Sequence, residues 1–128
     1  MAATPPPPVA FAALPAGWHV FSDGDGAYAT SWAYRENSFG WAASMPRGGI
    51  VVRVFFPPGA KAPRPALRLV VPKAPATTLE GVPDTPEYRL RGRVAGRDAE
   101  VWIDVRRPRP TPGELRTIRR VLAAIRFA

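Results

Sequence analysis

The chain lacks cysteine and has a single histidine, His19, among its 128 residues. Without cysteine there are no disulfide bonds, no thiolate metal ligands and no thiol nucleophile. A zinc site normally needs two or more His or Cys ligands. We therefore predict that the protein holds no metal and that His19 is an ordinary strand residue with a water or carbonyl partner.

Motifs that mark common enzyme classes and cofactor sites are missing as well. There is no G-x-S-x-G nucleophile elbow, no phosphate-binding glycine loop and no dinucleotide-binding fingerprint. The segment Asp23-Gly24-Asp25-Gly26 begins like a calcium loop but lacks the later oxygen ligands and the distal Glu, so it predicts a hairpin turn. These absences predict a protein that is not an enzyme and uses no cofactor.

No apolar run reaches the roughly 20 residues that a membrane-spanning helix needs. Residues 1–16 are predicted to be a Pro-rich tail with Pro5 to Pro8 in an extended polyproline conformation, and residues 17–128 a single domain. The tail lacks the basic start of a signal peptide. The segment Ala2-Ala3-Thr4 before the prolines would suit a mature secreted chain in which Met1 replaces the signal peptide. This favours a location outside the cytoplasm, with a cytoplasmic location as the alternative.

Positive charge is plentiful and unevenly placed. The formal net charge is +8, and only two of the 18 basic residues are lysines. From Arg106 onward the chain has seven arginines and one acid, Glu114, which indicates attraction to nucleic acid, anionic lipid or an acidic partner. The candidate nucleic-acid or anion-binding residues are Arg106, Arg107, Arg109, Arg116, Arg119 and Arg120. The favoured interpretation is that these arginines form the solvated face of a helix, since net charge bears on solubility before function, and binding to one of these partners is the alternative.

Alternating patterns predict the strands of the first half. Strands are expected over Trp18 to Ser22, Ala27 to Tyr34 and Phe39 to Ser44, with aromatic residues at alternate positions of the latter two and small residues between them. The aromatic set would lie on one face of the sheet: Tyr28, Trp32, Tyr34, Phe39 and Trp41. This face is either the main core or, if the small face packs inward, an exposed ligand-binding platform for sugar rings or peptide side chains.

The second half is predicted to supply the centre of the sheet. Ile50 to Phe56 is too apolar for an edge and is expected to be a central strand. Ala66 to Val71 is expected to form a further short strand. Pro72 to Pro86 is expected to be a long loop with one helical turn near Thr77 to Glu80.

Two more strands, Glu87 to Val94 and Arg97 to Val105, flank Ala95-Gly96, and a two-residue turn there fixes their register. Arg93 then faces Asp98, Arg91 faces Glu100 and Arg89 faces Trp102, while on the other face Leu90 meets Val101 and Tyr88 meets Ile103. The arginine run therefore predicts ion pairs and a cation–π contact in preference to a nucleic-acid stripe. The same ion pairing accounts for Asp98, Glu100 and Asp104, for which carboxylate catalysis is the alternative.

The final element is predicted to be an amphipathic helix over residues 112–126. Thr111-Pro112-Gly113-Glu114 is a capping box with proline at the first helical position. An apolar stripe follows, formed by Leu115, Ile118, Val121, Leu122 and Ile125. The helix is expected to pack this stripe on the sheet, and contact of its basic face with a membrane or a nucleic acid is the alternative.

These elements predict one α+β domain, in which a twisted antiparallel sheet of six or seven strands is packed by the C-terminal helix. Its core should hold Val52, Val54, Leu90, Val101, Ile103, Leu115, Ile118, Leu122 and Ile125. Leu14-Pro15-Ala16-Gly17-Trp18 opening the sheet, the closing hairpin and Ile125-Arg126-Phe127 after the helical stripe resemble the small Mog1/PsbP-like domains, which include bacterial lipoprotein and secreted-protein domains. The resemblance implies a sheet packed by helices and a non-enzymatic binding or assembly role. It implies no functional residues, and the Pro-rich stretch 57–86 departs from the family.

Two functional hypotheses follow from the sequence. The first is a non-catalytic binding or assembly domain outside the cytoplasm, whose partner is a protein or a small ligand. The second is a nucleic-acid-binding protein that uses its arginine-rich C-terminal segment. Affinity for nucleic acid that falls steeply with salt would distinguish the second hypothesis from the first.

Overall fold

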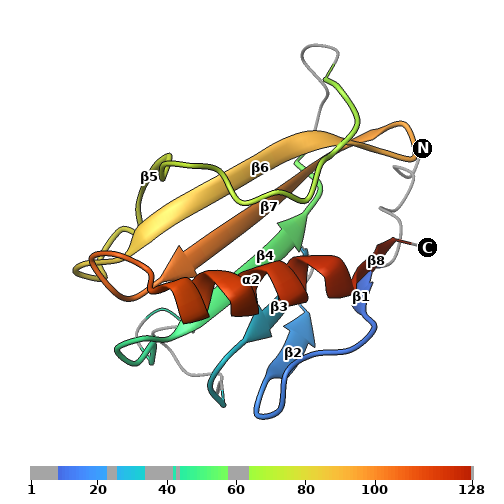
Figure 1. The fold of residues 1–128 in the computed structure, drawn as a ribbon. Coiled ribbons are helices and arrows are strands. Elements are labelled where there is room, and N and C mark those ends of the chain that lie inside the picture. The colour runs from blue at the N-terminus through green and yellow to red at the C-terminus, as the bar shows by residue number, and fades with distance from the viewer. Residues whose placement is uncertain (1–8, 23–25, 34–41, 43, 58–63, 128) are drawn as a thin grey trace.

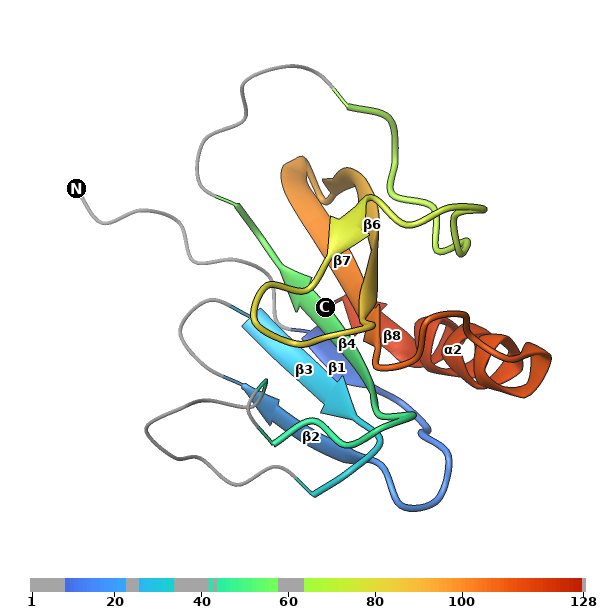
Figure 2. The same cartoon turned by 90° about the vertical axis from the view of Figure 1, so that its left-hand side faces the viewer.

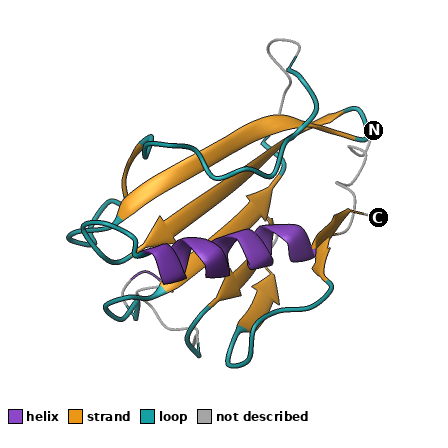
Figure 3. Cartoon of the chain, viewed as in Figure 1, coloured by secondary structure: helices purple, strands orange, loops and turns teal. Residues whose placement is uncertain are grey.

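Residues 9–22, 26–33, 42, 44–57 and 64–127 are described by a computed structural model of the chain. They form an α+β fold, which confirms the predicted class: a six-stranded antiparallel sheet, a separate two-stranded sheet and the helix α2 (Pro112–Ala124) (Figures 1 and 3). The strands of the large sheet are β2 (His19–Ser22), β3 (Gly26–Thr30), β4 (Ile50–Phe55), β5 (Thr77–Thr78), β6 (Pro86–Val94) and β7 (Arg97–Val105). Their order across the sheet is β2-β3-β4-β7-β6-β5.

The hydrophobic core lies between α2 and one face of the large sheet, where the helix crosses the strands (Figures 1 and 2). β4 lies between β3 and β7, so it is central, as its apolar sequence predicts. Ile118, Val121 and Leu122 of α2 are buried in one cluster with the inward-facing residues of the strands. Of the nine predicted core residues, eight are buried and Leu115 is partly buried against the same cluster.

The N-terminus of α2 begins at the predicted capping box. The Glu114 N–H donates to the Thr111 hydroxyl at 3.1 Å, and the Thr111 N–H donates to the Glu114 carboxylate at 2.8 Å. Pro112 follows the cap, where its missing N–H costs no helical hydrogen bond. This end of the helix is therefore fixed by local chemistry next to the linker that leaves β7.

The helix ends two residues before its predicted end, because the chain becomes extended at Ile125. β8 (Ile125–Phe127) pairs antiparallel with β1 (Val9–Phe11) in the two-stranded sheet. Val9, Phe11 and Leu14 pack against the core, so residues from Val9 onward belong to the folded domain and not to a tail. Residues 1–8 of the predicted tail lie outside the described residues.

The long hairpin of β6 and β7 has the predicted register. Arg93 faces Asp98, Arg91 faces Glu100, Arg89 faces Trp102, Leu90 faces Val101 and Tyr88 faces Ile103. The turn residues Ala95 and Gly96 both have positive φ, 51° and 78°, as a two-residue hairpin turn requires. The apolar partners face α2 and the charged partners face away from it, because a strand presents alternate residues to opposite faces.

Two strands predicted for the first half differ in the structure. The strand predicted over Ala27 to Tyr34 ends at Thr30, whose hydroxyl donates to the Trp32 carbonyl at 2.7 Å as the chain bends. The strand predicted over Phe39 to Ser44 lies mostly outside the described residues. At its described end, the Met45 N–H donates to the Ala42 carbonyl at 3.3 Å, which is a turn and not a strand contact.

The Pro-rich stretch also has less regular structure than predicted. Ala66 to Val71 contributes only an isolated parallel bridge between Ala66 and Arg93, because β6 ends one residue after Arg93 and Pro65 supplies no N–H donor to extend a ladder in the other direction. The helical turn predicted near Thr77 to Glu80 is replaced by β5, which pairs with the start of β6.

Candidate anion-binding site

The aromatic side chains of β2 and β3 lie on the face of the sheet away from α2. Ala29 points inward and is fully buried in the core, so the small face of β3 is the inner one. Tyr28 is half-buried on the outer face, where its ring stacks on Phe21 with centroids 4.6 Å apart. Trp32 follows the end of β3, and its Nε1 donates to the Ser44 hydroxyl at 3.2 Å. The other predicted platform residues, Tyr34, Phe39 and Trp41, lie outside the described residues.

The outer face continues as a row of cross-strand neighbours. From Tyr28 the row passes to Arg53 on β4, Trp102 on β7 and Arg89 on β6. The guanidinium carbons of Arg53 and Arg89 lie 4.9 and 3.9 Å from the Trp102 ring centroid. The Arg89 contact confirms the predicted cation–π pair, whereas the role of Arg53 was not predicted. Its signal in the sequence is one charged residue within an otherwise apolar central strand.

Arg53 also joins a buried charge cluster on this face. One of its terminal nitrogens, Nη2, lies 2.7 Å from the Glu87 carboxylate and 3.1 Å from the Asp104 carboxylate. Arg89 forms a second ion pair with Glu87 at 2.7 Å. Glu87 is 2% exposed and Asp104 is 0% exposed. Because neither carboxylate reaches the surface, this charge cluster is internal to the fold.

The two carboxyl groups of this cluster have opposite pKa shifts. Burial and the hydrogen bond with Glu87 raise the pKa of Asp104 to about 8. Burial opposes ionisation of Glu87 too, but its pKa lies below the usual value. The causes are hydrogen bonds with Asp104 and Arg89 and the positive charges of Arg53 and Arg89. At neutral pH, Asp104 therefore holds a proton that it can donate to the Glu87 carboxylate.

This proton makes stability depend on pH. The unfolded chain releases it near pH 4 and the folded chain near pH 8, so we expect the free energy of unfolding to fall as the pH rises between about 5 and 8. Asp104→Asn keeps a neutral hydrogen-bond donor and should flatten this decline. Urea denaturation at a series of pH values measures the slope, and an equal slope in both proteins would contradict the assignment of the proton to Asp104.

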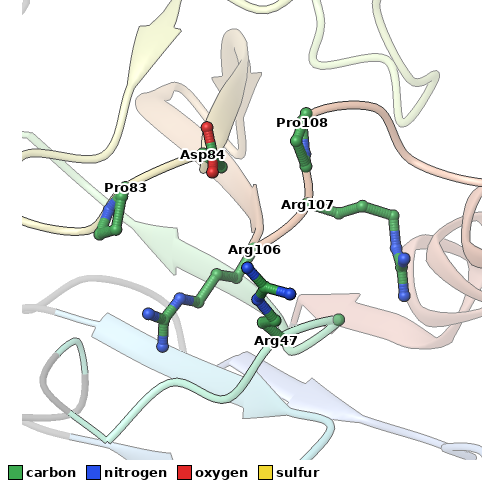
Figure 4. Close-up of a pocket in the computed structure, with 7 residues that line it drawn as sticks. Arg47, Pro83, Asp84, Arg106, Arg107 and Pro108 are labelled. Atoms are coloured by element: carbon green, nitrogen blue, oxygen red, sulfur yellow. The ribbon is translucent and has the colours of Figure 1, made fainter.

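A basic hollow of about 230 Å³ lies at the end of the sheet where β7 leaves for α2 (Figure 4). Arg106 and Arg107 come from the linker 106–110, and Arg47 comes from the loop before β4. Pro83 and Asp84 line the same hollow from the loop before β6. The loop and the linker are joined by backbone hydrogen bonds, from Gly48 N–H to the Arg106 carbonyl and from Arg106 N–H to the Gly49 carbonyl, both 2.9 Å. These bonds hold Arg47 beside the linker arginines.

The two linker arginines are also anchored to their surroundings. The Arg106 guanidinium donates to the Met45 carbonyl. The Arg107 Nε lies 2.9 Å from the Glu114 carboxylate, which is also part of the helix cap. A guanidinium held in one place loses less entropy when it binds an oxyanion than a free one does. This hollow can therefore hold a phosphate, sulfate or carboxylate group.

A second, larger groove of about 560 Å³ begins on the other side of Pro108. Segment 71–75, the start of β6, the linker and α2 form its walls. Arg109 and Arg119 line it together with Lys73. The structure thus places four of the six predicted arginines at these two sites: Arg106 and Arg107 line the basic hollow, and Arg109 and Arg119 line the groove. Of the other two, Arg120 lies beside Ala12 and Arg116 is exposed on α2.

Paired and unpaired cations are segregated between the two sides of the described structure. On the outer sheet face, Arg53, Arg64, Arg89, Arg91 and Arg93 each form an ion pair with a carboxylate. On the helix side, Arg107 is paired to Glu114. Within the described part of the chain, no carboxylate pairs with Arg68, in the segment beside β6, or with Arg47, Lys73, Arg106, Arg109, Arg116, Arg119, Arg120 or Arg126. The positive potential is therefore concentrated around the linker and α2.

Two of these cations, Arg47 and Lys73, were not predicted as site residues. Both are single basic residues in Pro- and Gly-containing loops far from Arg106 in the sequence. Only the packing of those loops beside the linker brings them to the basic end, so no local pattern could have identified them.

Comparisons with protein-family models, curated proteins and solved structures found no match. Within the described residues, no group of three His, Cys, Asp or Glu side chains could hold a metal ion. A search of the same residues for a helix with the length and apolarity of a membrane span also found none.

Proposed function

We propose that the protein is a non-catalytic binding domain whose basic end holds a polyanionic partner. The observation that carries the proposal is the segregation of cations: arginines on the outer sheet face are paired with carboxylates, whereas in the described part of the chain those around the linker and α2, other than Arg107, are not. Unneutralised arginines with surface exposure attract and orient polyanions.

Duplex nucleic acid is the polyanion that we propose first. Arg116 and Arg120 lie one turn apart on the exposed face of α2, and the basic hollow adjoins the start of the same helix. Such a row of cations can follow a phosphate backbone. Among these residues there is no aromatic side chain on which unpaired bases could stack, which favours a duplex over a single strand.

Binding of a fluorescein-labelled DNA duplex, followed by anisotropy over a range of KCl concentrations, tests this proposal. We expect the affinity to fall steeply with salt. The slope of the log–log plot should decrease by about 1.8 in Arg116→Gln/Arg120→Gln, since each lost phosphate contact contributes about 0.9. Both side chains are exposed and lack carboxylate partners in the described structure, so the fold should be preserved.

The matched control is Arg91→Gln/Arg93→Gln, which removes the same charge from the outer sheet face. These arginines are paired with Glu100 and Asp98, so their loss should leave the slope unchanged. Absence of binding at low salt would reject nucleic acid as the partner. An equal change in both double variants would show that net charge alone, and not the basic end, attracts DNA.

We propose separately, from the first sequence hypothesis, a location outside the cytoplasm; it rests on the composition of residues 2–8 and is independent of the DNA contact. Fractionation of cells that express the protein from its own gene would test it. Recovery in the cytoplasmic fraction would contradict this part of the proposal and leave the binding site unaffected.

A further inference from the structure

The groove beside Pro108 combines an apolar floor with a cationic rim. Val71, Tyr88 and Leu115 supply apolar surface, and Tyr88 is only 7% exposed while the other two are partly buried against the core. Lys73, Arg109 and Arg119 are exposed and come from three different segments of the chain. In the described structure no carboxylate neutralises any of the three.

The walls of this groove are poor in hydrogen-bond donors. Five of its twelve lining residues are prolines: Pro72, Pro75, Pro86, Pro108 and Pro110. Because proline has no N–H, these walls cannot form the ladder that an extended peptide would need. A nucleic-acid base would also lack a platform, since the Tyr88 ring is nearly covered. The lining instead suits a hydrocarbon chain.

We propose that this groove binds a single-chain amphiphile with an anionic head group, such as an alkyl carboxylate or an alkyl phosphate. The chain would lie on Val71, Leu115 and the prolines, where it leaves water. The head group would receive charge-assisted hydrogen bonds from Lys73, Arg109 and Arg119. The volume of about 560 Å³ lies within the range of small-molecule sites. This site is separate from the exposed arginines Arg116 and Arg120 that the proposed DNA contact uses.

Isothermal titration calorimetry with octanoate, decanoate and dodecanoate, each below its micelle concentration, tests the proposal. Affinity should rise by up to about fourfold for each added methylene that is buried in the groove. Decanol, which has the same chain and no charge, should bind more weakly. Decyl phosphate should bind at least as well as decanoate, because the rim recognises an anion and not a particular acid. Equal binding of decanol and decanoate, or affinity that is independent of chain length, would overturn the proposal.

The variant Lys73→Gln/Arg119→Gln removes two rim charges that have no carboxylate partner in the described structure. We expect it to weaken decanoate binding roughly tenfold and to leave decanol binding unchanged. Arg116→Gln/Arg120→Gln is the matched control, because it removes the same charge from the exposed side of α2 and should bind decanoate normally. An equal loss of decanoate affinity in the two double variants would contradict binding in the groove.

Vesicles containing equal parts of phosphatidylglycerol and phosphatidylcholine separate a monomeric ligand from a membrane surface. Binding to these vesicles without binding to monomeric decanoate would reject the groove and indicate surface adsorption by the cations.

Loss of DNA binding in Arg116→Gln/Arg120→Gln, with decanoate binding intact, would support both sites. Failure of DNA binding in the native protein would reject the proposed function alone and leave the groove to be decided by the amphiphile titrations.

Discussion

Replacing Ile118 with aspartate is expected to abolish or nearly abolish folding. Ile118 is 0% exposed and lies in the centre of the cluster between α2 and the sheet. An aspartate there would either bury an unpaired charge or take up a proton at a large cost, and it would also remove the apolar contacts of the isoleucine. The loss should be on the order of 4 kcal/mol or more, which is a large share of the roughly 5–15 kcal/mol that stabilises a typical domain.

Urea denaturation followed by circular dichroism measures this loss. Ala123→Asp is the matched control, because Ala123 lies on the exposed side of the same helix. The control carries the same new charge and loses more helix propensity than Ile118→Asp does, but it buries nothing, so its effect should stay near 1 kcal/mol or below. If the two variants were equally stable, α2 would not be packed as described.

Replacing Arg53 with methionine is expected to have the second largest effect when stability is measured at pH 9, where Asp104 is ionised. The side chain is 16% exposed and binds two carboxylates, at 2.7 and 3.1 Å, that are almost fully buried. Methionine retains most of the apolar stem but leaves Asp104 without a cation and Glu87 with Arg89 only. Removal of one partner from a buried ion pair typically costs about 3–5 kcal/mol, because the remaining charge stays in the interior.

A second substitution shows whether the buried carboxylate causes this loss. In Arg53→Met/Asp104→Leu both the cation and the more deeply buried acid are gone, and replacement of buried ion pairs by apolar side chains is often neutral or stabilising. The double variant should therefore unfold at a higher urea concentration than Arg53→Met. A double variant that is less stable than Arg53→Met would show that packing around Arg53, and not its charge, determines stability.

Local rules predicted the hairpin and the helix start because both depend on short segments. A two-residue turn with Gly96 fixes every pair from Val94–Arg97 to Tyr88–Ile103, and a one-residue slip would bury arginines. The cap at Thr111 depends on four consecutive residues. The burial of Val101, Ile103 and Ile118 follows from the same patterns combined with the helix period.

The elements that were mispredicted depend on partners far away in the sequence. Ile125 to Phe127 continues the apolar stripe of the helix, and only pairing with Val9 to Phe11 makes it a strand. The aromatic pattern over Ala27 to Tyr34 suggested a longer strand than β4 can pair with, since Ser31 is the last residue of that segment to bond Ile50. Pairing across long sequence separations overrides local preference in these places.

The candidate site was predicted in part. Its arginines between Arg106 and Arg120 were found because they are concentrated in one segment, and the pairing of the Arg89 to Arg93 run was found because the hairpin register was known. The division of the basic end into a polar hollow and an apolar groove was not predicted. It depends on where the loops that carry Arg47 and Lys73 lie against the linker, and the prolines of those loops give no periodic signal.

The pairing of β1 with β8 also constrains how the chain can fold during its synthesis. Val9 faces Phe127, so β1 has no partner until the ribosome has added more than a hundred further residues. At about 5–20 residues per second this takes on the order of ten seconds. During that time Val9 and Phe11 stay exposed on the nascent chain, and α2 cannot be fixed against them. The two-stranded sheet therefore forms only after residues 125–127 have left the ribosome, which makes its closure a late step of folding.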